Sequence, residues 1–369
     1  MIEIIIKLTQ SVILIYFREV PLMSLTYREI KGQYKALQQT FEYMVAKRAE
    51  FTSFVREQAV TSVTFVGSGS SYCLSEAAAF SFRLRAGLPA LSLAAGDLML
   101  HADRYRPMLA GTLAIAPSRS GSTSEVVEAL RLIQSEERIP VLSISCVENS
   151  PLSARADFAL ELPWAFDDSV CQTRTVTNLY AANLLLAAFL AGDENLIADM
   201  QTAIHQGEAY MTRVENDIRR ASDFAWTNAV VLADGELQGL AAEGAIALTE
   251  IAKTQAHAYH LLDVRHGPMV TVGPDTLVIA ALSDSGIDHQ RNLMRDIKDR
   301  GATVIAFADR TEAAPQDIVD LAITTDSPLD PAVRGIPFIF IPQIAALANA
   351  ERHGINPDQP DGLVAWVKL

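Results

Sequence analysis

The chain repeats its own pattern, and this internal duplication is the feature that most constrains its fold. Four pairs of segments share an offset of about 165 residues, namely Val63–Gly69 with Ala229–Gly235, Thr112–Ser118 with Thr276–Ser283, Leu130–Ile144 with Met294–Phe307, and Phe158–Leu162 with Leu321–Thr325. Because one pattern occurs twice, the sequence predicts two similar structural units in tandem.

Each copy reads as strand, helix, strand, helix, strand, strand and helix. The strand segments are nearly continuous apolar runs, which is typical of parallel sheets covered by helices on both faces. Alternating strands and helices with short connections indicate a doubly wound fold. We therefore expect an α/β fold with two doubly wound parallel sheets, flanking helices and a binding site in the cleft between the copies.

The segments around the two copies predict helices and a closing tail. The expected division is an N-terminal extension, an accessory strand or helix, over 1–22, a helical segment over 23–55, a first unit over 56–215, a second unit over 216–352 and a C-terminal tail closing the site over 353–369. Thr26 and Glu29 have the spacing of a capping box where the helical segment begins. Residues 176–190 predict a buried helix, and the amphipathic segment 194–222 predicts a helix that bridges the copies.

Composition argues against several classes of partner. The formal charge of −14 disfavours nucleic acid, because proteins bind its phosphates with Lys and Arg. The apolar segment 2–17 is shorter than a membrane-spanning helix, and no signal-peptide cleavage site follows it. Cys73, Cys146 and Cys171 show neither paired spacing nor a metal-binding pattern. We expect a cytoplasmic protein that uses no metal or cofactor and binds no membrane.

The clearest candidate for chemistry is the loop that follows the strand segment 112–118. Small hydroxyl residues gather there around Gly121, and a helical pattern begins directly afterwards. A helix N-terminus offers free N–H groups and a positive dipole end to an anion. The hydroxyl groups that can add donors are those of Ser118, Ser120, Ser122 and Thr123. Since no P-loop Lys is present, the loop predicts a phosphorylated small molecule; a Ser-rich turn with an ordinary N-cap is the alternative.

Two other loops are weaker candidates. In Val66–Tyr72, two glycines let the backbone approach a ligand closely, but the third glycine of a dinucleotide-binding fingerprint is missing. This loop fits an ordinary turn as well as half of a phosphate or sugar pocket. In Asp167–Thr177, either Gln172 and Arg174 face a substrate or the segment is an N-cap cluster with Arg174 on the surface.

Two carboxylates and a histidine are candidates for acid–base chemistry. Glu243 and Glu250 are two turns apart on one face of a predicted helix, among apolar residues. A carboxylate there is either a half-exposed solubilising group or a buried base with a raised pKa. His266, sixteen positions after Glu250, is fixed by the following Gly-Pro turn. A structural histidine is the common alternative, but the two together would suit proton transfer on a sugar.

Together these motifs resemble the sugar isomerase (SIS) domain family in tandem, over residues 56–369. Within this family they are most similar to the isomerase half of glucosamine-6-phosphate synthase and to stand-alone amino-sugar-phosphate deaminases, isomerases and deglycases. The segments that carry the resemblance, in the family's order, are Val66–Tyr72, Ser118–Thr123, Val170–Arg174, Glu243–Glu250, Arg265–Pro268 and Asp358–Pro360.

The resemblance implies a role for each matching residue. Glu250 would move a proton between C1 and C2 of the sugar. His266 would assist ring opening, and in this family it commonly reaches the neighbouring subunit's site, which implies a homodimer or a dimer of dimers. The implied substrate-binding residues are Gly67, Ser68, Ser70, Ser71, Ser118, Arg119, Ser120, Ser122, Thr123, Gln172, Arg174 and Glu243, with the 6-phosphate on Ser70, Ser71, Ser118, Ser120 and Thr123.

Departures from the family's pattern bear on the reaction. The synthase's glutaminase domain is missing from this sequence, so we expect no glutamine-derived ammonia. Ala365 stands where the synthase has its Schiff-base lysine, with Lys368 three residues further on, and Ala247 replaces a lysine of the catalytic helix. We therefore expect a phosphosugar isomerase or deaminase that acts on a 6-phosphorylated amino sugar by 1,2-proton transfer. The alternatives are a fructosamine-type 6-phosphate deglycase and, in another class, a phosphosugar-binding regulatory protein.

Overall fold

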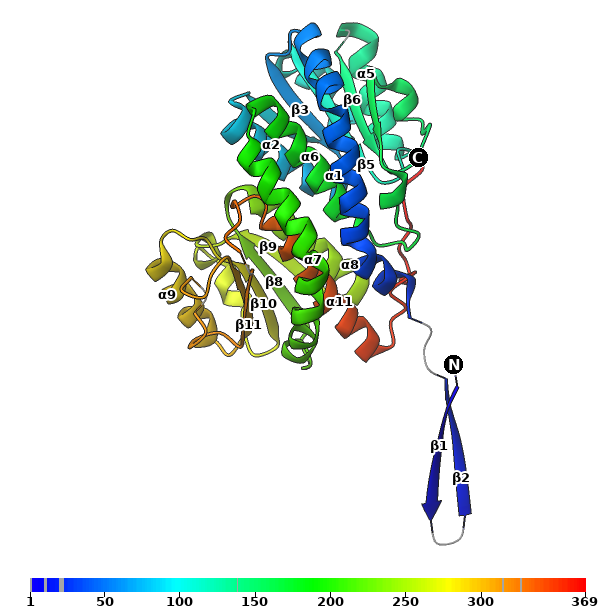
Figure 1. The fold of residues 1–369 in the computed structure, drawn as a ribbon, viewed down its shortest axis with the longest axis vertical. Helices are drawn as coiled ribbons and strands as arrows, with labels where there is room; N and C mark the ends of the chain where they lie inside the picture. Colours follow the sequence, from blue (N-terminus) through cyan, green and yellow to red (C-terminus); the bar gives the residue numbers. More distant parts are fainter. Residues whose placement is uncertain (1, 10–11, 20–22, 138, 314, 326) are drawn as a thin grey trace.

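Two five-stranded parallel sheets form the body of the protein, one for each copy of the repeat (Figure 1). The structure, a computed structural model, describes residues 2–9, 12–19, 23–137, 139–313, 315–325 and 327–369. The strand order of the first sheet is β4 (Ala90–Ala94), β3 (Ser62–Gly67), β5 (Thr112–Ser118), β6 (Val141–Ser145) and β7 (Phe158–Glu161). The second sheet repeats it with β9 (Gln255–His260), β8 (Asn228–Ala233), β10 (Thr276–Ala281), β11 (Thr303–Ala308) and β12 (Leu321–Thr324). The matching order confirms the predicted tandem doubly wound α/β fold.

Helices connect the strands and flank both sheets. Their bounds are α1 Leu25–Glu57, α2 Ser70–Ser81, α3 Ala95–Leu100, α4 Ala102–Tyr105, α5 Ser124–Glu137, α6 Arg174–Ala191, α7 Glu194–Ala221, α8 Gln238–Ala252, α9 Ile287–Lys298, α10 Gly335–Phe338 and α11 Phe340–His353. The helix predicted over 176–190 is α6, which is buried along nearly its whole length. The bridging helix predicted over 194–222 is α7, capped by Asp193, whose side chain accepts a hydrogen bond from Leu196 N.

Each sheet contains one strand that the sequence pattern did not predict. β4 and β9 lie at sheet edges, beside β3 and β8. In β4 only Ala90 is buried, and β9 is exposed or half-exposed at every position. An edge strand that buries little carries no apolar run, so hydrophobic periodicity gives no signal for it.

The body of the molecule is built in five layers, with helices between the sheets and on both outer faces. Because side chains alternate along a strand, Phe65 lies in the central core while Val66 packs with α3 and α5 on the outer face. In the second sheet, Val231 lies in the central core and Val230 packs with α9. The central layer contains α1, α2, α6, α7, α8 and α11 (Figure 1). One hydrophobic core therefore joins the inner faces of both sheets.

The long helix α1 has a different N-cap residue from the one that the sequence pattern predicted. Its N-cap is Ser24, whose side chain accepts a hydrogen bond from Tyr27 N at 3.1 Å. The predicted capping box of Thr26 and Glu29 is wrong, because both side chains bind segments that are distant in sequence. The buried positions of α1 recur every three or four residues, as one apolar stripe requires: Ile30, Tyr34, Leu37, Phe41 and Met44.

Residues of the predicted N-terminal extension form an antiparallel pair of strands, β1 (Ile2–Thr9) and β2 (Val12–Glu19). A strand was one of the forms predicted for this segment. Residues 1, 10, 11 and 20–22 of the predicted extension lie outside the described residues. Within the described ranges, the structure contains no helix that is both long and apolar enough to span a bilayer.

Candidate active site

Three loops of the first copy lie at the carboxyl edge of the first sheet. Residues 67–70 follow β3, residues 118–124 follow β5, and residues 166–173 lead into α6. From β3 the chain moves outward to β4, whereas β5, β6 and β7 lie on the other side of β3. Open α/β sheets bind ligands at such a switch point, outside the carboxyl ends of the strands.

Two glycines allow the first two loops to close. A Cβ on Gly67 would lie 2.5 Å from Ser71 O, and one on Gly121 would lie 2.2 Å from Ser150 Oγ. Gly121 also has a φ of 59°, a conformation that favours glycine. Both positions therefore need glycine for reasons of space, and Gly121 for its backbone conformation as well.

Serine side chains organise the loop before α5. Ser118 Oγ accepts a hydrogen bond from Gly121 N at 3.0 Å, and Ser120 Oγ accepts one from Ser122 N at 3.1 Å. Both serines are buried, and Ser122 and Thr123 are half-buried in the same turn. A hydroxyl that accepts still has its O–H to donate. The loop can therefore offer hydroxyl donors, and the first turn of α5 its N–H groups, to an anion.

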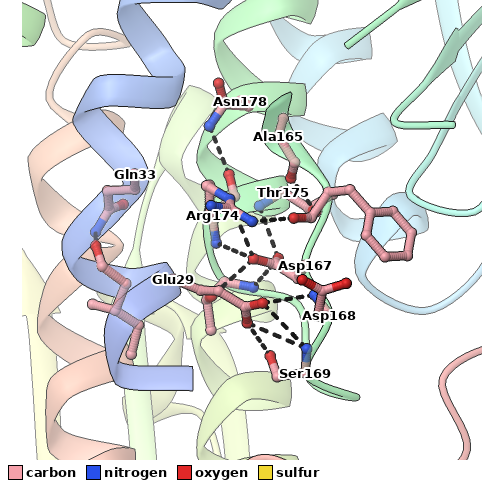
Figure 2. Close-up of polar contacts among 12 residues, drawn as sticks. Glu29, Gln33, Ala165, Asp167, Asp168, Ser169, Arg174, Thr175 and Asn178 are labelled. Carbon is pink, nitrogen blue, oxygen red and sulfur yellow. Dashed lines mark hydrogen bonds and ion pairs between the residues drawn. The ribbon is translucent and has the colours of Figure 1, made fainter. Parts of the chain in front are cut away.

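Two buried carboxylates hold the third loop (Figure 2). The Asp167 side chain caps α6, accepting hydrogen bonds from the backbone N–H groups of Thr173, Arg174 and Thr175. Glu29 of α1 accepts hydrogen bonds from Asp168 N at 2.6 Å and from the Ser169 hydroxyl. Burial raises the pKa of both carboxyls, and the charge of Asp167 raises that of Glu29 further. These contacts fix the loop to both helices.

Arg174 and Gln172 differ in their surroundings. The Arg174 guanidinium donates to Phe166 O, and Figure 2 shows this side chain between α6 and α1. Its Nη1 is 3.8 Å from where a Cβ on Gly32 of α1 would lie. Gln172 Oε1 is buried and, among the described residues, has no hydrogen-bond partner. Among the described residues, Arg174 Nε is likewise buried without a hydrogen-bond partner, 3.8 Å from Asp167 Oδ1, so each of the two predicted contacts keeps an unused polar atom.

The second copy supplies two carboxylates to this edge through α8. This helix crosses α2 so closely that a Cβ on Gly239 would lie 2.3 Å from Cys73 O. Glu243 interacts with the hydroxyl of Ser70 in the first turn of α2, and Glu250 with the thiol of Cys171 in the third loop. A helix of one copy thus carries its side chains to the sheet edge of the other copy.

Burial raises the pKa of both α8 carboxyls. Glu243 is 1% exposed, and desolvation and the charge of Glu250 hold its pKa well above the usual range, while the Ser70 hydroxyl has the opposite effect. For Glu250, burial raises the pKa while the charge of Arg119 and the thiol of Cys171 lower it. A carboxylate whose pKa is raised is a better general base than one in water, provided that it still ionises.

Arg119 connects the second loop to the third loop and to the C-terminal tail. It is 3% exposed, and its Nη1 donates to Ser169 O at 3.0 Å and to Val170 O at 2.8 Å. Its Nη2 donates to Ala365 O. Burial lowers the pKa of this guanidinium, and Glu250 is one of the anions that oppose the shift. The side chain predicted to bind substrate is therefore occupied with three backbone carbonyls and faces the charge of Glu250.

The C-terminal tail runs across the first copy. Asp358 accepts a hydrogen bond from Thr26 N at 2.8 Å, at the start of α1. Further along, Val367 O accepts a hydrogen bond from Ser124 N at 3.4 Å, at the start of α5. Between the tail and the end of α8 lies a cavity of about 390 Å³ with Glu250 in its wall. These contacts place the tail beside the site that it is predicted to close.

His266 lies at the opposite end of the second sheet from Glu250. α8 ends at Ala252, next to the start of β9, whereas His266 follows the end of β9. The six residues of β9 span roughly 20 Å at about 3.3 Å each. One chain therefore does not bring the two predicted catalytic groups together, and His266 is exposed.

A family model described as SIS domain matches residues 58–189 and 224–340. Among curated proteins, the isomerizing glutamine–fructose-6-phosphate aminotransferase of Photorhabdus laumondii is 26% identical over 327 residues, which is 84% of this chain and 52% of that protein. The chain thus spans about half the length of the curated relatives it matches.

Solved structures share this fold. The tagatose-6-phosphate ketose/aldose isomerase of Escherichia coli matches with a TM-score of 0.80 and 23% identity, over 93% of this chain and 96% of that one. The glucosamine-6-phosphate deaminase of Thermotoga maritima matches with a TM-score of 0.76 and 24% identity, over 94% of this chain and 100% of that one. At these identities the likeness establishes the fold.

Proposed function

Because this chain belongs to the SIS-domain family, we propose that it is an enzyme that acts on a 6-phosphorylated amino sugar by 1,2-proton transfer. The observation that carries the proposal is the position of Glu250. This half-buried carboxylate from the second copy reaches the sheet edge where the first copy presents hydroxyl groups and the N-terminus of α5. Relatives named for fructose 6-phosphate, tagatose 6-phosphate and glucosamine 6-phosphate have a sugar 6-phosphate in common.

In the proposed reaction, the phosphate binds the second loop and the sugar extends toward α8. Glu250 takes the proton from C2 of an open-chain 2-amino sugar and returns it to C1, which leaves an imine at C2. Water then hydrolyses the imine to a ketose 6-phosphate and ammonia. The Cys171 thiol, whose pKa burial raises, stays protonated and can donate to the ionised Glu250. Ser120, Thr123 and the other predicted loop residues bind substrate.

The position of His266 supports a homodimer as part of this proposal. Within one chain, His266 is too far from Glu250 to open a sugar ring there, because the length of β9 separates the two residues. Ring opening by this residue therefore requires the His266 of a second chain. His266 is exposed and thus free to reach a second copy. We therefore assign ring opening to the partner's copy of this side chain.

The deciding experiment replaces Glu250 with Gln and follows glucosamine 6-phosphate by proton NMR in deuterated water. We expect Glu250→Gln to lower deuterium exchange at C2 by at least about a hundredfold, the usual contribution of a general base, while calorimetric binding persists. The exposed Glu42→Gln is the matched control.

Ser120→Ala should have the opposite effect. It should weaken binding of sugar 6-phosphates but leave deuterium exchange in the bound substrate unchanged.

Unchanged exchange in Glu250→Gln would remove this residue as the base. If the natural protein binds the sugar phosphate but catalyses neither exchange nor ammonia release, the chain is instead a phosphosugar-binding regulatory protein.

A further inference from the structure

The loop proposed to bind phosphate in the first copy has a counterpart in the second copy. The chain reads Ser-Arg-Ser-Gly at 118–121 and Ser-Asp-Ser-Gly at 283–286. Each segment follows the middle strand of its sheet, β5 or β10, and precedes a helix, α5 or α9. The glycine of each loop has a positive φ, 59° in the first copy and 64° in the second. The two loops therefore differ in one charged side chain, Arg119 in the first and Asp284 in the second.

A cavity of about 720 Å³, here called the second-copy cavity, lies at this edge of the second sheet. Its wall is formed by residues at or beyond the ends of β10, β11 and β12, by the segment before α10 and by Asp199 of α7. This volume is within the range of small-molecule pockets. Open α/β sheets bind ligands outside the carboxyl ends of their strands. The second copy therefore has its own cavity at the edge that corresponds to the proposed active site of the first.

Two buried charged residues, Asp309 and Arg334, line the second-copy cavity. Arg334 Nη2 is 3.1 Å from Asp309 Oδ2 and donates to Asp284 Oδ2 at 3.2 Å. The other oxygen of Asp309, Oδ1, is buried and has no hydrogen-bond partner among the described residues. Arg310 Nε lies 3.7 Å from it, which is too far for a hydrogen bond. A buried carboxylate oxygen without a donor is unfavourable, so a ligand with an N–H group would stabilise this site.

The charge of the cavity wall is negative. The acidic residues that the structure describes there are Asp199, Asp284, Asp309 and Glu312, and the basic ones are Arg310 and Arg334. Burial raises the pKa of Asp284, but the hydrogen bond and the charge of Arg334 outweigh this effect and lower it. The exposed carboxylate of Asp284 is therefore ionised at neutral pH. A cavity with an excess of negative charge attracts cations and repels phosphate.

Other polar side chains of the wall carry hydroxyl groups, namely Thr311, Thr324, Thr325 and Ser327. Ser327 Oγ accepts a hydrogen bond from Gln206 Nε2 at 3.0 Å, so its O–H is still available to donate. Hydroxyl groups that can donate, together with carboxylates that accept, suit a ligand that itself carries several hydroxyl groups.

We propose that the second-copy cavity binds an amino sugar without a phosphate, whose ammonium group pairs with Asp284 and Asp309. The ammonium group would supply the donor that Asp309 Oδ1 lacks, and the sugar hydroxyls would contact the threonine and serine side chains of the wall. This site lies outside the proposed active site and does not depend on its chemistry, so either can fail without the other.

Calorimetric titration of the natural protein with glucosamine at pH 6.5, where the amine is protonated, tests this site. Glucose, which has a hydroxyl group in place of the amine, is the matched probe. We expect glucosamine to bind about tenfold to a hundredfold more tightly than glucose, as a hydrogen bond between charged groups allows. Asp284→Asn and Asp309→Asn should each remove most of this difference, whereas Asp284→Glu should keep it. Asp284→Arg, which gives the loop the sequence of the first copy, should abolish glucosamine binding.

Two controls should bind glucosamine as the natural protein does. Asp299→Asn removes an exposed carboxylate at the other end of α9, and Glu250→Gln changes the proposed active site. Equal affinity for glucosamine and glucose, or no binding of glucosamine, would overturn the inference. So would natural affinity in both Asp284→Asn and Asp309→Asn. Competition by inorganic phosphate would indicate an anion site, and loss of binding in Glu250→Gln would indicate the active site, so either result would also overturn it.

Discussion

Among single residues, Arg119 has the most direct influence on the proposed base. Its guanidinium is buried and its charge lowers the pKa of Glu250, whereas burial raises it. Only the ionised carboxylate can take a proton from carbon. The balance between these two effects therefore determines the lowest pH at which the site can work.

We predict that Arg119→Gln shifts the acidic limb of the kcat/KM profile to higher pH. With Arg119 gone, the pKa of Glu250 rises, so the carboxylate becomes protonated at a pH where it was ionised before. Arg119→Lys keeps the charge and should keep the limb close to its natural position. The measurement is kcat/KM between pH 5 and pH 9 with one sugar phosphate. An unmoved limb in Arg119→Gln would show that Glu250 does not titrate beside this charge.

The sequence predicted the residues whose local pattern is distinctive. The hydroxyl loop at Ser118–Thr123 and the spacing of Glu243 and Glu250 are both visible within a few turns of chain. It could not predict that Glu29 would bind Ser169, because 140 positions separate them. It also gave Thr26 the N-cap role that Ser24 fills instead. Contacts between distant segments leave no local pattern to detect.

At the level of elements, the crossing of α2 and α8 positions both α8 carboxylates. The helices touch through backbone at Gly239, with Ala77 N only 2.7 Å from where a Cβ would lie. Small residues at a crossing let two helices approach more closely than side chains permit. The crossing therefore determines how far Glu250 extends over the first sheet.

We predict that Gly239→Ala destabilises the protein by about 1–3 kcal/mol, the usual cost of overpacking, and lowers kcat more than it raises KM. The added methyl group must push α8 away from α2, which displaces Glu250. Gly96→Ala is the control, since a Cβ on Gly96 of α3 meets no atom within 4 Å. Urea unfolding and initial rates measure both variants. Equal stability of the two would contradict the close contact.

Element types were predictable where burial was complete. All seven residues of β5 are buried, and its apolar run is plain in the sequence. β4 and β9 were not predicted because edge strands bury few side chains and therefore need no apolar run. The register that pairs Val63 with both Ala90 and Leu113 depends on contacts that no single segment encodes.

In the molecule as a whole, Arg85 joins the two copies. It lies in the short helical segment Phe82–Ala86 of the first copy and is 13% exposed. Its Nε and Nη2 contact both carboxylate oxygens of Glu236 at 2.7 Å. Its Nη2 also contacts Asp330 Oδ1 at 2.5 Å. Both acidic residues belong to the second copy, so this network pins the copies together beside the shared core.

We predict that Arg85→Met lowers the free energy of unfolding by about 3–5 kcal/mol, because it leaves the buried carboxylate of Glu236 and the half-buried one of Asp330 without their counter-charge. Adding Glu236→Gln to this variant should restore part of the loss. Arg131→Met, which breaks an exposed pair with Glu128, should cost far less, because water screens an exposed ion pair. Guanidinium unfolding followed by circular dichroism measures all three. A loss in Arg85→Met no larger than in Arg131→Met would contradict the role of this network.

The duplicated architecture was predictable because the repeat is long and its strands are strongly apolar. The assembly of a site from the α8 of one copy and the sheet edge of the other was not. Each copy follows the same local rules, and nothing in those rules states which helix packs on which sheet. That choice follows from the central core that the two copies share.

Because α8 contacts α2 at Gly239, a small tilt of α8 about this contact moves the far end of the helix, where Glu250 lies. From position 239 to position 250 is eleven residues, or roughly 16 Å of helix at 1.5 Å per residue. A tilt of about 5° at the crossing would therefore displace Glu250 by roughly 1.4 Å, and an error of about 1 Å can cost about a hundredfold in rate. In the proposed reaction, the angle between the two copies would therefore control the rate, and substitutions far from the sugar would change turnover by changing that angle.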